Sequence, residues 1–109
     1  MSSAKRLDST EDGLLSDSQL EHAAEMLKLL ANPCRLHLVQ LLERESMPVN
    51  TLVELTGSQQ TTVSGHLRKM KICGIVNSEH RGREVWYRLE NECALSLLNC
   101  MTKYFHSNR

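Results

Sequence analysis

Four cysteines are the most reactive side chains in this sequence, and their spacing limits what they can do together. They are Cys34, Cys73, Cys93 and Cys100. None of them forms a CxxC pair, so the pattern does not indicate a zinc knuckle or a thioredoxin-type dithiol. Thiolates nevertheless bind soft metal and metalloid ions and react with oxidants. Any joint reaction of these thiols therefore depends on which side chains the fold brings beside them.

A run of short or amide polar side chains forms a second chemically useful group. It consists of Gln59, Gln60, Thr61, Thr62 and Ser64. Such side chains can hydrogen-bond the edges of bases and the oxygens of phosphates. By composition alone they could equally well face water. They crowd the first turns of a predicted helix, however, and the backbone amides of a helix N-terminus also attract phosphate.

The distribution of charge supports a nucleic-acid partner for the same region. The 109 residues contain 13 Lys and Arg and 13 Asp and Glu, a formal net charge of zero. This balance argues against a purely electrostatic coat protein for nucleic acid. Residues 58–83, however, hold five basic residues and one acidic residue, whereas residues 1–57 hold five basic and nine acidic residues. A local basic patch of this kind is the footprint of a DNA-binding domain.

The composition also excludes several classes of protein. With 40% hydrophobic and 24% charged residues, the chain is an ordinary globular protein with room for one domain. No nucleophile–base pair, phosphate loop or metal triad stands at useful spacing, so we predict that it is not an enzyme. No apolar run could span a bilayer and no apolar signal core is present, which predicts a cytoplasmic protein with reduced thiols and no membrane partner. We expect residues 1–15 to be a disordered tail and residues 16–109 to form the domain.

Capping signals predict two helices in the first part of the chain. Ser18 and Glu21 match a capping box, so a helix should begin there. Asn32 and Pro33 then mark a stop and a restart, because Pro suits the first position of a helix and Asn its cap. The second helix should run to about Arg44.

The middle of the chain predicts a helix-turn-helix. Residues 46–48 read as a loop, and residues 49–55 as a short helix that ends at Gly57. Ser58 can cap the next helix, residues 59–72, whose apolar positions would be Val63, Leu67, Met70 and Ile72. Two helices joined by a tight glycine turn are typical of the motif whose second helix enters the major groove.

The last part of the chain predicts a hairpin and a final helix. After Gly74 the apolar period changes to two, which indicates strands at 75–76 and 85–89 with a turn at Arg81 and Gly82. Asn91 then caps a helix that runs to about His106. The predicted fold is mainly α with a small β-hairpin (α+β), in the order α-α-α-α-β-β-α.

Four segments, in this order, resemble the ArsR-type family of bacterial regulators. They are residues 29–36 (LLANPCRL), 62–67 (TVSGHL), 74–76 (GIV) and 82–89 (GREVWYRL). The likeness extends over about residues 18–106. Members of this family are metal- and redox-responsive winged helix-turn-helix repressors. The resemblance implies a homodimer that binds double-stranded operator DNA and releases it on ligand binding or oxidation at cysteine or histidine sites.

The resemblance assigns the second helix of the motif to DNA recognition and the hairpin to a wing. The expected DNA-binding residues are Gln60, Thr61, Thr62, Ser64, His66, Arg68, Lys69, Lys71, Arg81 and Arg83. Two residues depart from the family pattern. Ser58 stands where the family usually has Leu, and Gly65 stands where it often has Arg, Gln or Asn. The operator sequence therefore stays open.

The resemblance also implies a dimer interface between the first and last helices. The residues expected there are Leu20, Leu27, Leu97, Met101 and Tyr104.

The metal sites of the family are not retained. Residues 49–53 contain no cysteine, although arsenic and cadmium sensors often carry a Cys pair there. Another family site uses a carboxylate or Asn together with histidines on the last helices. Its positions are occupied here by Asn91, Cys93, Tyr104 and Ser107, so a zinc site is not expected.

Cys93 and Cys100 are the remaining sensor candidates, and they need a second chain. Seven residues apart, they share a helix face but are separated by a rise of about 10 Å. A disulfide needs Cα atoms within about 7 Å, so the two can neither bond nor share an ion within one helix. In an antiparallel dimer, Cys93 could meet the partner subunit's Cys100, or Cys100 its own symmetry copy. Both registers stay open, as does simple packing at the interface.

We therefore predict a repressor with no obligatory cofactor that is released by a thiol-reactive inducer, such as trivalent arsenic or another soft metal ion. Cys34, at a helix start where the dipole favours a thiolate, is a further candidate. Cys73 is expected to fill the core, although a cadmium-sensing branch of the family has a similar Cys. Two alternatives remain, a redox or reactive-sulfur sensor and a winged-helix interaction module that does not bind DNA.

Overall fold

The computed structural model of the chain describes residues 13–107. Its elements are α2 (Asp17–Leu30), α3 (Pro33–Arg44), β1 (Met47–Pro48), α4 (Val49–Thr56), α5 (Gln60–Ile72), β2 (Val76–Arg81), β3 (Glu84–Leu89) and α6 (Glu92–Ser107). The predicted fold class and order of elements are confirmed, with β1 as an addition. Residues 1–12 of the predicted tail and residues 108–109 of the predicted domain lie outside the described residues.

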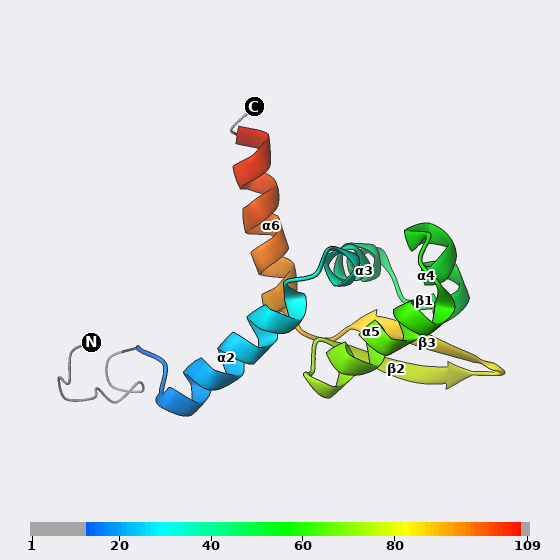
Figure 1. Ribbon diagram of the computed structural model, residues 1–109, viewed down its shortest axis with the longest axis horizontal. Helices are drawn as coiled ribbons and strands as arrows, with labels where there is room; N and C mark the ends of the chain where they lie inside the picture. Colours follow the sequence, from blue (N-terminus) through cyan, green and yellow to red (C-terminus); the bar gives the residue numbers. More distant parts are fainter. Residues whose placement is uncertain (1–12, 108–109) are drawn as a thin grey trace.

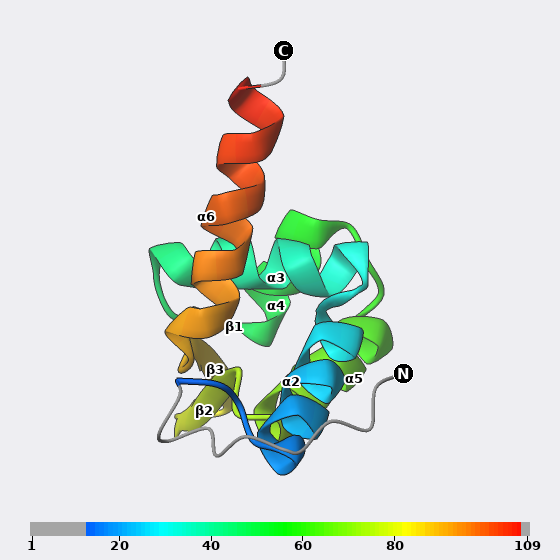
Figure 2. The same cartoon turned by 90° about the vertical axis from the view of Figure 1, so that its left-hand side faces the viewer.

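The elements separate into a central body and two helices that extend from it. Figure 1 shows α3, α4, α5 and the sheet packed together, with the β2–β3 hairpin reaching away on the side opposite to α2. Helix α6 stands out from the body along much of its length, as Figure 2 shows from a second direction. The molecule is flat, with principal extents of 53 × 38 × 21 Å.

The core lies where α3, α4 and α5 meet the sheet. Its buried side chains are Leu30, Leu38, Val39, Leu42, Met47, Leu52, Val63, Leu67, Met70, Ile75, Val76, Tyr87 and Ala94. In α5 the buried residues are Val63, Leu67 and Met70, as the spacing predicts. Ile72 was predicted to share that face and does not, since its side chain is 88% exposed. At 100° per residue it lies 200° around the helix from Met70.

Helix α2 begins two residues earlier than predicted. Ser16, not Ser18, is the N-cap, and it forms a capping box with Gln19. The Gln19 amide donates to Ser16 Oγ at 3.2 Å, and the Ser16 amide donates to Gln19 Oε1 at 2.9 Å. Gln serves as well as Glu at this position, and the earlier start places Asp17 in the first turn, where its charge complements the helix dipole.

Helix α5 also begins differently from the prediction. Its N-cap is Gln59, which makes no side-chain cap. Ser58, the predicted cap, instead belongs to the turn, where its amide donates to Thr56 Oγ1 at 3.3 Å. Its Oγ lies 3.6 Å from Cys34 Sγ on α3. The turn itself follows the prediction, because Gly57 ends α4 in the left-handed conformation with φ 73°.

The sheet contains one strand that the sequence did not predict. Met47 and Pro48 were expected in a loop, but they pair antiparallel with Tyr87 and Trp86 of β3. The sheet order is β1-β3-β2, so β1 covers the edge of the hairpin that faces α3 and α4. Two residues are too few to show the alternating apolar pattern of a strand, so β1 is recognised only by its pairing with β3.

Candidate nucleic-acid interface

Helix α5 presents a polar side to solvent because Val63, Leu67 and Met70 turn into the core, while Ile72 at its end stays exposed. The predicted contact residues Gln60, Thr61, Thr62, Arg68 and Lys69 are exposed. No side chain caps the N-terminus of α5, so the first backbone amides of this helix are available to a hydrogen-bond acceptor from another molecule. The helix N-terminus lies beside α4 and points toward the same side of the molecule as the hairpin tip (Figure 1).

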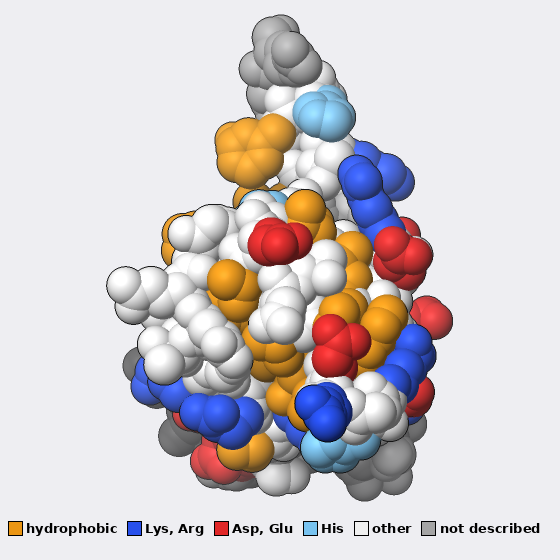
Figure 3. Space-filling model, turned by 90° about the vertical axis from the view of Figure 1, so that its right-hand side faces the viewer, with side chains coloured by type: hydrophobic (Ala, Val, Ile, Leu, Met, Phe, Trp, Pro, Cys, Tyr) orange, Lys and Arg blue, Asp and Glu red, His pale blue; other side chains and the backbone are white. Residues whose placement is uncertain are grey.

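A cleft lies between α5 and the wing. Gln60, Ser64 and Arg68 line it from α5, one helical turn apart, and Arg83 lines it from the hairpin turn. Its volume is about 380 Å³. Asn50 of α4 and Glu84 of β3 also line the cleft, and sequence reasoning did not identify either of them. Figure 3 shows the face of the molecule that carries the hairpin tip, with basic side chains along its lower part and both uncharged and acidic side chains above and beside them.

The two wing arginines have different surroundings. Arg81 Nε is 2.7 Å from Glu79 Oε2, and its guanidinium lies 4.2 Å over the ring of Trp86. The hydrogen bond from Arg81 lowers the pKa of the Glu79 carboxyl. Arg83 is exposed at the tip and lines the cleft. Arg81 is therefore engaged within the wing, whereas Arg83 is directed toward the space next to α5.

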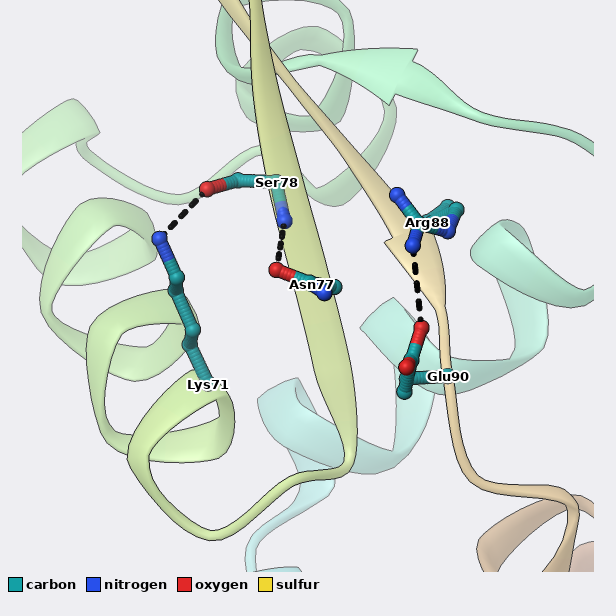
Figure 4. Close-up of polar contacts among 5 residues, drawn as sticks. All are labelled: Lys71, Asn77, Ser78, Arg88 and Glu90. Atoms are coloured by element: carbon teal, nitrogen blue, oxygen red, sulfur yellow. Dashed lines mark hydrogen bonds and ion pairs between the residues drawn. The ribbon is translucent and has the colours of Figure 1, made fainter.

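Lys71 connects the end of α5 to the wing. Its Nζ donates to Ser78 Oγ of β2 at 2.8 Å, and the Ser78 amide donates to Asn77 Oδ1 at 2.8 Å. Figure 4 shows this contact, with the ion pair between Arg88 of β3 and Glu90, which follows that strand. The structure thus places Lys71 at the base of the hairpin, away from the cleft residues that begin the helix.

His66 faces α3. Its Nδ1 accepts a hydrogen bond from Arg35 Nε at 2.9 Å, and Arg35 Nη1 donates to the Leu29 carbonyl at 2.9 Å. Burial, the positive charge of Arg35 and that of Lys69, in this order, lower the pKa of His66. Sequence reasoning placed His66 in the DNA-binding set and missed Arg35. Arg35 and His66 lie in two of the segments that resemble the family, residues 29–36 and 62–67. This shared resemblance was the only signal in the sequence that could have pointed to Arg35.

The four thiols occupy two kinds of environment. Cys93 and Cys100 are exposed on α6, whereas Cys34 and Cys73 are half-buried against the core. The Cys93 amide donates to Asn91 Oδ1 at 2.7 Å, which is the cap predicted for this helix. Within residues 13–107, no group of three or more His, Cys, Asp and Glu side chains is placed to hold a metal ion.

The helices that extend from the body carry uncovered apolar side chains. Of the predicted interface residues, Leu20, Leu27, Met101 and Tyr104 are 53%, 54%, 42% and 57% exposed. Leu97 is half-buried in an apolar groove of about 530 Å³ between α2, α3 and α6. Leu14, Leu15 and Phe105 add to the exposed apolar surface and were not predicted. None of the helices in the described range is long and apolar enough to cross a membrane.

Comparison with known proteins identifies the family. Residues 32–78 match the family described as bacterial regulatory protein, arsR family. The HTH-type transcriptional regulator KmtR of Mycobacterium tuberculosis (strain ATCC 25618 / H37Rv) is 35% identical over 78 residues, which are 72% of this chain and 60% of KmtR. This chain therefore spans less than two thirds of that relative. The transcriptional repressor PagR of Bacillus anthracis is 34% identical over 84 residues, covering 73% of this chain and 84% of PagR.

A solved structure agrees in fold. The homodimeric winged helix-turn-helix DNA-binding domain of Mb0332 from Mycobacterium bovis, described as a possible ArsR-family regulator, superposes with a TM-score of 0.75 at 28% identity. The match covers 86% of this chain and 90% of that domain. These relatives are regulators rather than enzymes, in agreement with the prediction from sequence. The chain belongs to the arsR family of bacterial regulatory proteins and has its winged helix-turn-helix fold.

Proposed function

We propose that this protein is a dimeric repressor that binds operator DNA through α5 and the wing and releases it when a thiol-reactive inducer reaches the cysteines of α6. The observation that carries the proposal is the cleft between α5 and the wing. There Gln60, Ser64 and Arg68 share one side, and Arg83 closes the other.

The chemistry of the cleft suits duplex DNA. Amide, hydroxyl and guanidinium groups together recognise base edges in the major groove, and Arg pairs with guanine in a bidentate manner. Helix α5 spans 13 residues, about 20 Å at 1.5 Å per residue, which suits an element that lies in that groove. Arg83 at the wing tip is placed to contact a phosphate beside the groove. The basic residues of 58–83 would supply the sequence-independent part of the affinity.

The dimer would form through α2 and α6. Their exposed apolar side chains, with Leu27 and Met101 at the rim of the groove, form a surface that a second copy can cover. The homodimeric state named for the Mb0332 domain supports this assembly. A two-fold dimer would present two α5 helices to the two halves of an operator.

The inducer would act at the dimer interface. Cys93, Leu97, Cys100 and Tyr104 follow one another at intervals of four, three and four residues, so they form one stripe along α6. Burial of this stripe against the partner would bring thiols of both chains together. No cofactor is then obligatory, and trivalent arsenic or another soft ion would be the inducer. The proposal places the protein in the cytoplasm, where thiols are kept reduced.

Fluorescence anisotropy of the reduced protein on the DNA upstream of its own coding sequence tests the proposal. We expect binding that weakens steeply with salt and that arsenite abolishes in the wild type. The variants C93S and C100S should lose the response to arsenite. Cys73→Ala is the matched control, because it removes a half-buried thiol outside α6 and should leave the response intact.

Other outcomes point to the alternatives. Release by an oxidant without metal, together with indifference to arsenite, would favour a redox or reactive-sulfur sensor. Failure of the folded protein to bind DNA at low salt would refute the repressor and favour an interaction module.

A further inference from the structure

Arg35 connects three helices, α2, α3 and α5, through its hydrogen bonds. It lies in the first turn of α3 and donates from Nη1 to the carbonyl of Leu29 in the last turn of α2. From Nε it donates to Nδ1 of His66 in the middle of α5. Its own amide donates to Oδ1 of Asn32, the α3 cap, at 3.1 Å.

The contact at α2 supplies a hydrogen-bond donor to a carbonyl in the last turn of that helix. The last carbonyls of a helix have no partner within it. At the end of α2, the carbonyls of Lys28 and Leu30 accept from the amides of Ala31 and Asn32. The Leu29 carbonyl accepts from Arg35. A guanidinium at a helix C-terminus also interacts favourably with the helix dipole, so Arg35 is held firmly at this end of its bridge.

The contact at α5 depends on the protonation state of His66. An arginine is always protonated, so its Nε can only donate, and Nδ1 of His66 must therefore carry a lone pair. The neutral imidazole has its proton on Nε2. Protonation at Nδ1 would set an N–H against an N–H and place two cations 2.9 Å apart, and the bond would be lost.

We propose that Arg35 is a positioning residue for DNA binding, which fixes the recognition helix α5 to the end of α2 only while His66 is neutral. This inference rests on the proposed DNA-binding function. It goes beyond that function because it adds a residue outside the DNA face and a response to acid. The bridge then links α5 to the proposed dimerisation helix α2 in addition to the packing of the core.

The electrostatic surroundings of His66 fix the sign of the pH response. Its pKa lies below the ordinary value of 6.5, chiefly through burial and then through the charges of Arg35 on α3 and Lys69 on α5. Among the other elements packed on α5, α4 carries Glu54, and β2 carries Glu79, His80 and Arg81, with Glu79 already paired to Arg81. Because the folded state favours neutral His66, the bridge is intact above pH 6.5 and is lost as the pH falls through the lowered pKa.

Operator affinity measured across pH tests the proposal. Wild type and H66N are titrated onto the same DNA from about pH 8 to about pH 5.5 at constant ionic strength, a range that brackets histidine titration. Asn keeps an acceptor near the position of Nδ1 but does not titrate. The ratio of wild-type to H66N affinity cancels the contributions of the other histidines. We expect this ratio to fall on acidification, by less than about tenfold at about pH 5.5, because a pKa below 6.5 leaves part of His66 neutral there.

Two arginine variants separate the bridge from simple charge. R35K keeps the positive charge but loses the planar fork that reaches both acceptors. We expect it to bind DNA about tenfold more weakly than wild type at about pH 8, where about 1.4 kcal/mol is lost, and to show a flatter pH profile. R44K changes an exposed arginine in the last turn of the same helix and should behave like wild type.

An NMR titration of the free protein provides a readout that needs no DNA. The pKa of His66, assigned by its absence in H66N, should lie below 6.5 in wild type and rise in R35Q. A wild-type to H66N affinity ratio that stays constant or increases with acid would overturn the proposal, as would an unchanged His66 pKa in R35Q. If wild type does not bind DNA at any pH, the proposed function fails, and the NMR titration still decides the Arg35–His66 bridge.

Discussion

Replacement of Arg83 by Ala is the sharpest test of the proposed DNA interface. Arg83 is exposed at the hairpin tip and lines the cleft opposite Arg68. Arg81, two residues away, is already paired with Glu79 and stacked on Trp86. Arg83 is therefore the wing cation placed to meet a phosphate without first breaking an ion pair, and a phosphate contact carries no sequence information. The variant should bind all DNA sequences more weakly by a similar factor.

The size of the effect follows from counterion release. Each neutralised phosphate contributes about 0.9 to the slope of log affinity against log salt, and a dimer carries two wings, so the slope should fall by about 1.8. Between about 50 mM and about 200 mM salt, a fourfold change, the wild-type advantage should therefore shrink about twelvefold. Anisotropy titrations at four salt concentrations on specific and scrambled DNA measure both quantities.

Two controls complete this experiment. Arg83→Lys keeps the charge and should keep the wild-type slope, whereas Arg44→Ala removes an exposed arginine outside the cleft and should change nothing. An unchanged slope in Arg83→Ala, or a defect confined to the specific sequence, would refute the assignment of the wing tip to the DNA backbone.

Three further predictions concern the scaffold. Gly65→Ala should stabilise the protein by about 1 kcal/mol and raise Tm by about 4–8 °C in a calorimetric scan, because Gly65 is helical and an added Cβ would meet no atom within 4 Å. Gly74→Ala should lower Tm instead, because φ at Gly74 is +84°, where a side chain is strained. Leu67→Ala, in a fully buried position, should cost about 2–5 kcal/mol in urea unfolding; a cost below about 1 kcal/mol would contradict the core assignment. Met101→Glu should convert the dimer to a monomer in sedimentation, since it places a charge on the exposed apolar face of α6; a stable dimer would exclude that face.

Local signals explain why most of the fold could be predicted. Asn32 and Pro33 begin α3 as the capping rules require, and Gly57 ends α4 with a positive φ. Each of these features is determined by residues close together in the chain. Strand β1 could not be predicted in this way, because Met47 and Pro48 become a strand only through pairing with β3.

The candidate site was predicted less completely than the fold. Helical periodicity indicates which side chains of α5 face outward, and Gln60 and Arg68 do so. Periodicity does not indicate which partner a polar side chain finds. Lys71 reaches Ser78 on β2, and His66 accepts from Arg35, 31 positions earlier in the chain. These contacts depend on how α5 sits against other elements, which is decided by the packing of the whole core.

Helix α3 lies between the helix that carries the proposed sensor thiols and the proposed DNA-binding helix. Helix α6, which carries Cys93 and Cys100, packs against α3, and α3 in turn packs against α2, α5 and β3. Arg35 lies at the end of α3 where α2 and α5 meet it. If an inducer acts by shifting α6, α3 is placed to transmit the effect to α5, beside the hydrogen bonds from the Glu90 and Asn91 amides to the Ile75 carbonyl. Allosteric coupling is a difference in free energy that both sites share.

The R35K variant should therefore change the coupling as well as the affinity. We expect the ratio of operator affinities without and with arsenite to be smaller in R35K than in wild type, because part of the free energy that links α2, α3 and α5 is already lost. R44K should keep the wild-type ratio. An R35K protein that binds more weakly but is released by arsenite to the same extent as wild type would show that the signal reaches α5 by contacts other than this bridge.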